Sequence, residues 1–101
     1  MNISVDFDHT YTAAPELWQS FIKTAQSAGH KVYCVSARHY WETAEVYDTI
    51  GKIIGLNRCY LTDRKAKKPF MLAKGIQIDI WIDDTPEAIL LDKAEYKSKN
   101  S

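Results

Sequence analysis

Four carboxylates follow apolar runs at two distant places in the chain, and their pattern could hold a metal ion. Asp6 and Asp8 follow the run Ile3-Ser4-Val5, and Asp83-Asp84 follows a second apolar run. Because side chains alternate along a strand, Asp6 and Asp8 would project to the same side. Like charges held together are costly unless a cation lies between them. Carboxylate oxygens suit Mg²⁺, so the pattern predicts a magnesium site.

Hydroxyl and basic side chains stand at other predicted strand ends and could bind a phosphate. Ser36 and Arg38 follow an apolar run at 31–36. A basic loop before the last apolar run holds Lys65, Lys67 and Lys68, any of which could face the same point. Hydroxyl, guanidinium and ammonium groups donate hydrogen bonds to phosphate oxygens. The inferred substrate is therefore a phosphoryl group.

Alternating strand and helix patterns position these residues. Pro15 is suited to the first turn of a helix and Gly29 to its end. Trp41 is expected in the core at the start of the second helix. The patterns predict strands at 2–7, 31–36, 58–61 and 76–82, helices at 15–28, 40–54, 69–74 and from 85 onward, and a frayed tail at 93–101.

This alternation predicts an α/β fold, a three-layer α/β/α sandwich around a mainly parallel, Rossmann-like sheet of four or five strands. The strand order 3-2-1-4 would bring the ends of strands one, two and four together. Ligands bind beyond the carboxyl ends of such strands, where the acidic residues stand. The predicted fold therefore gathers the candidate residues in one crevice.

Length and composition narrow the class of protein. The 101 residues are expected to form one domain, 1–101, without room for a separate lid domain. Thirteen basic and thirteen acidic residues give no overall attraction to nucleic acid or anionic lipid. No stretch is apolar enough for a membrane span and none resembles a signal peptide, so a cytoplasmic location without a membrane partner is expected. Cys34 and Cys59 are expected to be free core residues.

Four motifs, in order, resemble those of the haloacid dehalogenase (HAD) superfamily of phosphotransferases. The run Asp6-Phe7-Asp8-His9-Thr10 is similar to the first, DxDx(T/V), and Ser36 to the Ser or Thr that closes the next strand. Lys68-Pro69 looks like the third, a Lys often followed by Pro, and Asp83-Asp84 like the acid pair that ends the fourth. The resemblance covers residues 2 to about 90.

The resemblance implies a Mg²⁺-dependent phosphatase. Asp6 would be the nucleophile that becomes an aspartyl-phosphate, and Asp8 would protonate the leaving oxygen and later take a proton from water. Ser36 and Lys68 would hold the phosphoryl oxygens, with Lys68 preferred for its match to Lys-Pro. The implied metal ligands are Asp6, Asp84 and the backbone carbonyl of Asp8, with Asp83 acting through water or orienting its neighbour.

Three further residues are candidates for substrate binding. Thr10 closes the first motif. His9 stands where the family commonly has Gly, so its bulkier, titratable side chain could narrow the site or touch the substrate. Arg38 could bind the substrate phosphate or pair on the surface, with His39, Tyr40 and Trp41 directly after it.

Members of the family usually carry a cap domain, inserted after the first motif or between the third strand and the Lys. The short segments at these two places predict that this chain has no cap domain. An open site could admit a phosphate on a macromolecule or be closed by a second subunit, so a homo-oligomer is one expectation. Ser36-Ala37-Arg38 is similar to the Ser-Gly-Arg sequence of 3′-phosphatase domains in polynucleotide kinase-phosphatases. We therefore expect the substrate to be a nucleotide or nucleic-acid end phosphate, with a small sugar or metabolite phosphate as the alternative.

Two other classes of protein remain as alternatives. One is a non-catalytic binding module that keeps the fold and the metal pocket. The other is a response-regulator receiver, in which phosphorylation would fall on Asp63 at the end of the third predicted strand. The second acid pair ends the fourth strand here, which disfavours the receiver.

Overall fold

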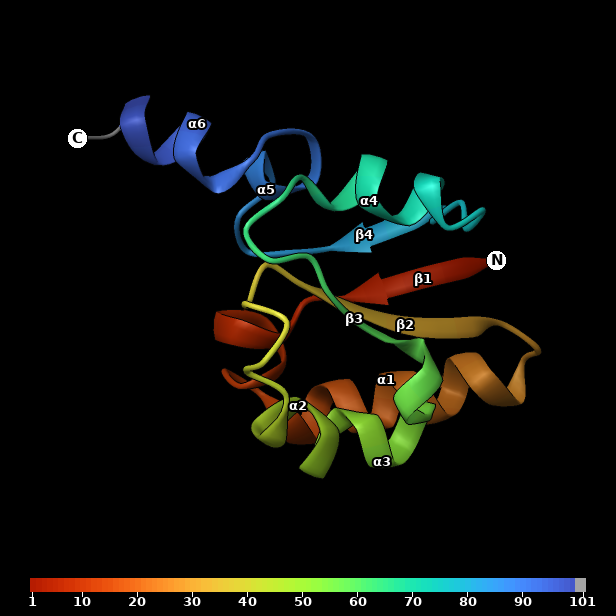
Figure 1. Cartoon of the computed structure of the whole chain (residues 1–101). Helices are drawn as coiled ribbons and strands as arrows, with labels where there is room; N and C mark the ends of the chain where they lie inside the picture. Colours follow the sequence, from red (N-terminus) through yellow and green to blue (C-terminus); the bar gives the residue numbers. More distant parts are fainter. Residues whose placement is uncertain (100–101) are drawn as a thin grey trace.

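The computed structural model describes residues 1–99, which form a four-stranded, all-parallel sheet in the order β3-β2-β1-β4 (Figure 1). The strands are β1 (Asn2–Val5), β2 (Lys31–Ser36), β3 (Cys59–Leu61) and β4 (Ile80–Ile82). In the central strand, Ile3 pairs with Val32 on one side and with Ile80 on the other. The predicted α/β class and strand order are confirmed.

Helices pack on both sides of the sheet because β2 is apolar on both faces. Val32 and Cys34 belong to the core cluster that includes Ile22 and Ile50, whereas Tyr33 and Val35 pack with Met71. In Figure 1, α1, α2 and α3 lie together below the strands, and α4 and α5 lie above them. The helices are α1 (Pro15–Ser27), α2 (Ala44–Asp48), α3 (Ile50–Ile54), α4 (Lys67–Ala73), α5 (Glu87–Leu90) and α6 (Lys93–Lys99).

The first helix forms where the sequence places it. It begins at Pro15, whose missing N–H is not needed in the first turn. Gly29 follows the helix end with φ +88°, and the next N–H, of His30, donates to Ala25 O at 3.0 Å. A left-handed residue at this position costs glycine little, so Gly29 ends the helix as expected.

The single helix expected at 40–54 is wrong, because α2 and α3 are separate. Thr49 lies between them with φ −118° and ψ −97°, and its hydroxyl donates to Glu45 O at 2.6 Å. A side-chain bond to the carbonyl four residues earlier competes with the helix and bends it. Residues 40–43 lie before α2, and Trp41 is 60% exposed rather than buried in the core.

The last strand and the tail also differ from expectation. Only Ile80–Ile82 of the predicted 76–82 strand pairs with β1; just before it, the Asp79 N–H donates to Asn2 O and the Asp79 side chain accepts the Asn2 N–H, both at 2.8 Å. The tail at 93–101 was expected to fray, but Lys93–Lys99 form α6, and residues 100 and 101 lie outside the described residues. Asp92 precedes α6, and its carboxylate accepts the Ala66 N–H at 2.7 Å. The tail is therefore joined to the segment before α4.

Two simpler expectations concern cysteines and membranes. Cys34 and Cys59 are buried and free, on neighbouring strands. Within residues 1–99, no helix has both the length and the apolar character that a membrane crossing requires.

Candidate functional site

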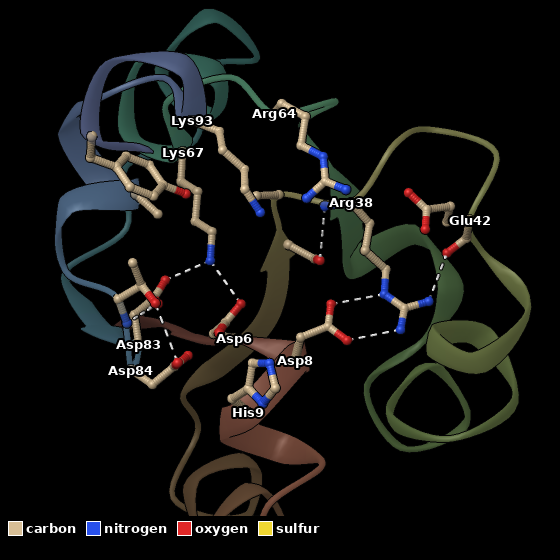
Figure 2. Close-up of a pocket in the computed structure, with 15 residues that line it drawn as sticks. Asp6, Asp8, His9, Arg38, Glu42, Arg64, Lys67, Asp83, Asp84 and Lys93 are labelled. Atoms are coloured by element: carbon tan, nitrogen blue, oxygen red, sulfur yellow. Dashed lines mark hydrogen bonds and ion pairs between the residues drawn. The ribbon is translucent and has the colours of Figure 1, made fainter. Parts of the chain in front are cut away.

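The carboxyl ends of β1, β2 and β4 meet at a pocket of about 340 Å³ (Figure 2). The predicted residues that line it are Asp6, Asp8, His9, Ser36, Arg38, Asp83 and Asp84. Thr10 lies beneath this group and is buried. Parallel strands place their carboxyl ends at one edge of a sheet, so residues up to 78 positions apart in the chain come together here.

A tight turn after β1, rather than strand alternation, directs Asp6 and Asp8 into the pocket. β1 ends at Val5, and the turn η1 (Phe7–Tyr11) follows, in which Asp8 and His9 have non-helical backbone angles. The Asp6 N–H still bonds to Ile82 O at 2.9 Å, and the Asp6 carbonyl accepts the Tyr11 N–H at 3.1 Å. His9 has φ +64°, a conformation that glycine adopts at lower cost. The exposed His9 side chain therefore stands at the pocket on a constrained backbone.

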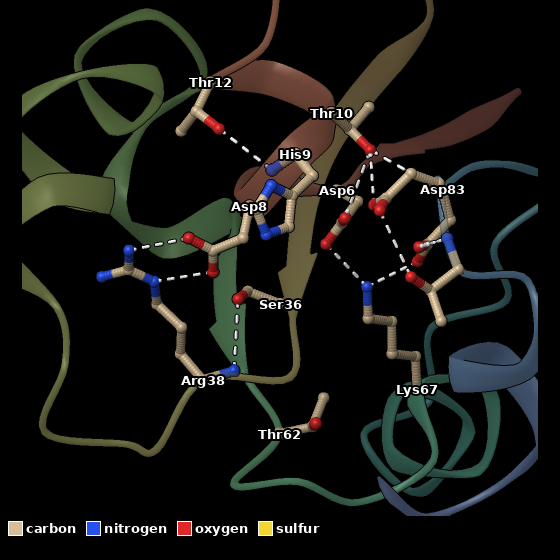
Figure 3. A network of polar contacts seen from close by, with 12 residues as sticks. Asp6, Asp8, His9, Thr10, Thr12, Ser36, Arg38, Thr62, Lys67 and Asp83 are labelled. Carbon is tan, nitrogen blue, oxygen red and sulfur yellow. Dashed lines mark hydrogen bonds and ion pairs between the residues drawn. The ribbon is translucent and has the colours of Figure 1, made fainter. Parts of the chain in front are cut away.

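Lys67, rather than the preferred Lys68, is the lysine that contacts Asp6 and Asp83. The Lys67 ammonium donates to Asp6 Oδ1 at 2.8 Å and to Asp83 Oδ2 at 2.5 Å (Figure 3). Lys67 is 2% exposed, whereas Lys68 is exposed and is not among the residues that line the pocket. Because α4 begins at Lys67, the next residue points about 100° further around the helix axis, away from β1.

Burial and charge set the protonation of Asp6 and Lys67. Asp6 is 6% exposed, and desolvation raises its pKa to about 7, with Lys67 opposing this rise and Asp83 adding to it. Burial also opposes the charged form of Lys67, but Asp6 and Asp83 raise its pKa above the usual value. Lys67 therefore stays charged at neutral pH, and Asp6 is a weak acid there.

Three of the predicted carboxylates lie close together. Ligand oxygens of Asp6, Asp83 and Asp84 lie within 4.8 Å of one another. The Thr10 hydroxyl lies 3.2 Å from Asp6 Oδ2 and 3.0 Å from Asp84 Oδ1. Burial works against the charged form of Asp84, yet hydrogen bonds from Asp6 and Thr10 keep its pKa below the usual value. An all-oxygen donor set of this kind fits a hard divalent cation such as Mg²⁺.

Asp8 lies apart from these carboxylates and is bound by Arg38. Nε and Nη2 of Arg38 donate to the two carboxylate oxygens at 2.9 and 2.8 Å, and these bonds hold the pKa of Asp8 below its usual value (Figure 3). Nη1 of Arg38 donates to Glu42 O at 3.4 Å. The Asp8 side chain is thus not part of the predicted metal group, and Arg38 orients Asp8 at the pocket wall.

Ser36 is at the end of β2 and 1% exposed. Its hydroxyl oxygen accepts the Arg38 N–H at 3.2 Å. A hydroxyl that accepts one bond still has a hydrogen to donate. The Ser36 hydroxyl therefore remains able to donate a hydrogen bond into the pocket.

Sequence reasoning missed two pocket residues of α6, Lys93 and Tyr96. Arg64, in the basic loop that was expected to be able to meet a phosphate, also lines the pocket. The signal for α6 was present, because Asp92 and Glu95 have the spacing of a helix-start capping box, and the Asp92 N–H donates to Glu95 Oε1 at 3.3 Å. The charge of Arg64 was apparent from the basic loop, but its direction was not, because its left-handed backbone (φ +69°) arises from the loop geometry.

No protein family, curated protein or solved structure gives a significant match to this chain. A buried carboxylate paired with a buried ammonium, beside further carboxylate oxygens and basic side chains, can attack an electrophile whose negative charge the basic side chains offset.

Proposed function

We propose that the chain is a Mg²⁺-dependent phosphomonoester hydrolase with the capless, three-layer α/β/α architecture of the HAD superfamily. One observation carries the proposal: buried Lys67 joins Asp6 to Asp83 at the edge of the sheet where three carboxylates gather. A like-charged cluster of this kind is suited to a cation and a phosphoryl group together. The order of Asp6, Ser36, Lys67 and Asp83-Asp84 along the chain follows the order of the HAD motifs.

Asp6, Asp83 and Asp84 would hold Mg²⁺, which supplies positive charge against phosphate oxygens when bound. A carboxylate oxygen of Asp6 attacks phosphorus, the ester oxygen leaves, and an aspartyl-phosphate forms on Asp6. Water then attacks this phosphorus, and inorganic phosphate and free Asp6 are released. Lys67 and Ser36 donate hydrogen bonds to the phosphoryl oxygens during both steps.

Asp8 is proposed to move protons in both steps. It gives a proton to the leaving oxygen and takes one from the attacking water. In the structure, Arg38 keeps Asp8 ionised. A substrate phosphate that draws Arg38 toward itself would weaken this pair and raise the pKa of Asp8 toward the range of an acid catalyst. Arg38 is therefore proposed to couple phosphate binding to proton transfer.

Exposed aromatic side chains favour a nucleotide or nucleic-acid end over a sugar phosphate. Tyr40 and Trp41 are 69% and 60% exposed, on the loop between Arg38 and Glu42, which both line the pocket. Trp41 stacks on His39, with ring centroids 4.4 Å apart, so a contact within the loop positions the Trp41 ring. Flat aromatic surfaces next to a phosphate site can stack on a nucleobase.

The proposal is tested by phosphate release with and without Mg²⁺ from four substrates: a 3′-phosphorylated oligonucleotide, a nucleoside 3′-phosphate, a nucleoside 5′-phosphate and a sugar phosphate. We expect Mg²⁺-dependent turnover of at least one nucleotide substrate and its loss in Asp6→Asn. Turnover of the sugar phosphate alone would refute the substrate class. Full activity of Asp6→Asn would refute the mechanism.

The Arg38–Asp8 pair favours a second candidate function, a non-catalytic module that binds phosphorylated ligands. A bidentate ion pair keeps Asp8 from acting as an acid unless a ligand separates it. Under this alternative, the chain binds nucleotides in the presence of Mg²⁺ but releases no phosphate with any divalent metal. Measured turnover by the parent chain would exclude it.

A further inference from the structure

We infer that Arg64 and Lys93 form a second anion-binding subsite for a phosphate that is not transferred; the inference rests on the proposed phosphatase function. The pocket of about 340 Å³ lies in the size range of small-molecule sites. It therefore offers space beyond the phosphoryl group held at Asp6. The ligand class is a phosphomonoester with a second phosphate, as in a nucleic-acid end or a bisphosphate.

Lys67, Arg64 and Lys93 bring positive charge to the pocket from three segments of the chain. Lys67 comes from the start of α4 and is engaged with Asp6 and Asp83. Arg64 and Lys93 also line the pocket, and Figure 2 shows both side chains extending into it from the loop after β3 and from α6. Their charges face the space above Asp6 and Asp8 rather than the carboxylate group itself. A second anion would meet this pair of charges.

The backbone beneath the two cations is fixed by several bonds. The Lys93 N–H donates to Arg64 O at 2.9 Å, so the two side chains start from adjacent points. The N–H groups of Asp63 and Arg64 donate to Arg38 O and Ala37 O at 2.9 and 3.0 Å. The subsite is thus tied to the same loop that carries Arg38.

Backbone strain marks the same place. Asp63 and Arg64 have φ values of +57° and +69°, and neither is glycine. Non-glycine residues in this region are uncommon in succession and persist only where surrounding bonds hold them. The strain fixes the direction in which the Arg64 side chain leaves the backbone. Guanidinium groups bind phosphate through paired hydrogen bonds, so such preorganisation favours phosphate over a neutral group.

Calorimetry on the whole chain tests the subsite without relying on turnover. An Asp6→Asn background with Mg²⁺ present prevents hydrolysis, and the probes are thymidine 3′,5′-bisphosphate and thymidine 3′-monophosphate. We expect the bisphosphate to bind about ten-fold tighter or more, because a charged hydrogen bond adds this much. Arg64→Gln and Lys93→Gln should each bring the ratio of the two affinities toward one while leaving monophosphate affinity within about three-fold.

A matched control is Lys52→Gln, which removes the same charge from an exposed residue of α3 outside the pocket. It should leave the ratio unchanged. Comparing fructose 1,6-bisphosphate with fructose 6-phosphate tests whether the second phosphate can come from a sugar bisphosphate as well as from a nucleic-acid end. A large ratio for either pair supports the subsite, and a large ratio only for the thymidine pair assigns it to nucleic-acid ends.

The subsite is refuted if the Asp6→Asn background binds the two probes of each pair equally or not at all, or if both Gln variants keep the full ratio. Phosphate release by the chain with intact Asp6 is measured separately. A large affinity ratio without phosphate release would support the subsite and refute the phosphatase. Phosphate release without an affinity ratio would support the phosphatase and refute the subsite.

Discussion

Replacing Lys67 by Met removes the cation that holds the acidic residues together. Lys67 is 2% exposed, and the Asp6 and Asp83 side chains that it contacts are 9% and 3% exposed. Breaking a buried ion pair from one side costs about 3–5 kcal/mol, because the remaining charge is left without a partner. Here Asp83 is left without its cation, and so is the ionised fraction of Asp6. We expect the free energy of unfolding to fall by about 3–5 kcal/mol at neutral pH without divalent cations.

Lys68→Met is the matched control, since it makes the same chemical change one residue later. Lys68 is exposed, so its loss should change the free energy of unfolding by no more than about 0.5 kcal/mol. Urea unfolding followed by tryptophan fluorescence measures both variants, because the chain holds three tryptophans. The deficit of Lys67→Met should be smaller at pH 5 than at pH 8, since protonation of Asp6 relieves the repulsion from Asp83.

Two results would refute this reasoning. Equal losses of unfolding free energy in the Lys67 and Lys68 variants would show that the buried ion pairs of Lys67 contribute no more to stability than an exposed lysine does. A Lys67→Met deficit that grows as the pH falls would show that carboxylate repulsion is not its cause.

Three further variants test separate contacts. Burial raises the pKa of Asp6 from 3.8 to about 7, so the folded state favours the protonated carboxyl. This stabilises the folded chain fully below about pH 4, and the stabilisation is lost as the pH rises through about 7. Without divalent cations, the stability of the parent relative to Asp6→Asn should therefore fall by up to about 4 kcal/mol between these values, and a flat difference in urea unfolding would contradict this. In Arg38→Met, the pKa of Asp8, measured by NMR titration, should rise toward its usual value, with a loss of about 1 kcal/mol or less because Asp8 is 43% exposed. Asp92→Ala should lower the free energy of unfolding by about 1–2 kcal/mol, since the Ala66 N–H loses its acceptor; an unchanged urea midpoint would show that α6 is not held there.

Much of the fold could be predicted because local patterns and the sheet agree. The run at 31–36 is apolar on both faces, which predicts a central strand, and Gly29 ends the preceding helix as its type implies. The helix break at Thr49 could not be predicted, since it depends on a hydroxyl bond that competes with helix continuation.

The candidate site was predictable at the strand ends and uncertain in the loops. Asp6, Ser36 and Asp83 come together because parallel strands share one edge. The choice between Lys67 and Lys68 depended on where α4 begins, and a shift of two residues at the helix start changes which side chain faces β1. Lys93 was missed because a polar tail gives no apolar periodicity, although its capping residues were present.

The most direct measurement of the central claim is covalent trapping of the phosphoryl group. The chain is mixed with Mg²⁺ and a phosphomonoester that it hydrolyses, and the reaction is quenched in acid. The protein is then digested, and the peptides are analysed by mass spectrometry. We predict one hydroxylamine-sensitive phosphoryl group on Asp6, absent from Asp6→Asn. Phosphate release with no phosphorylated Asp6, or phosphorylation at Asp63 instead, would contradict the account.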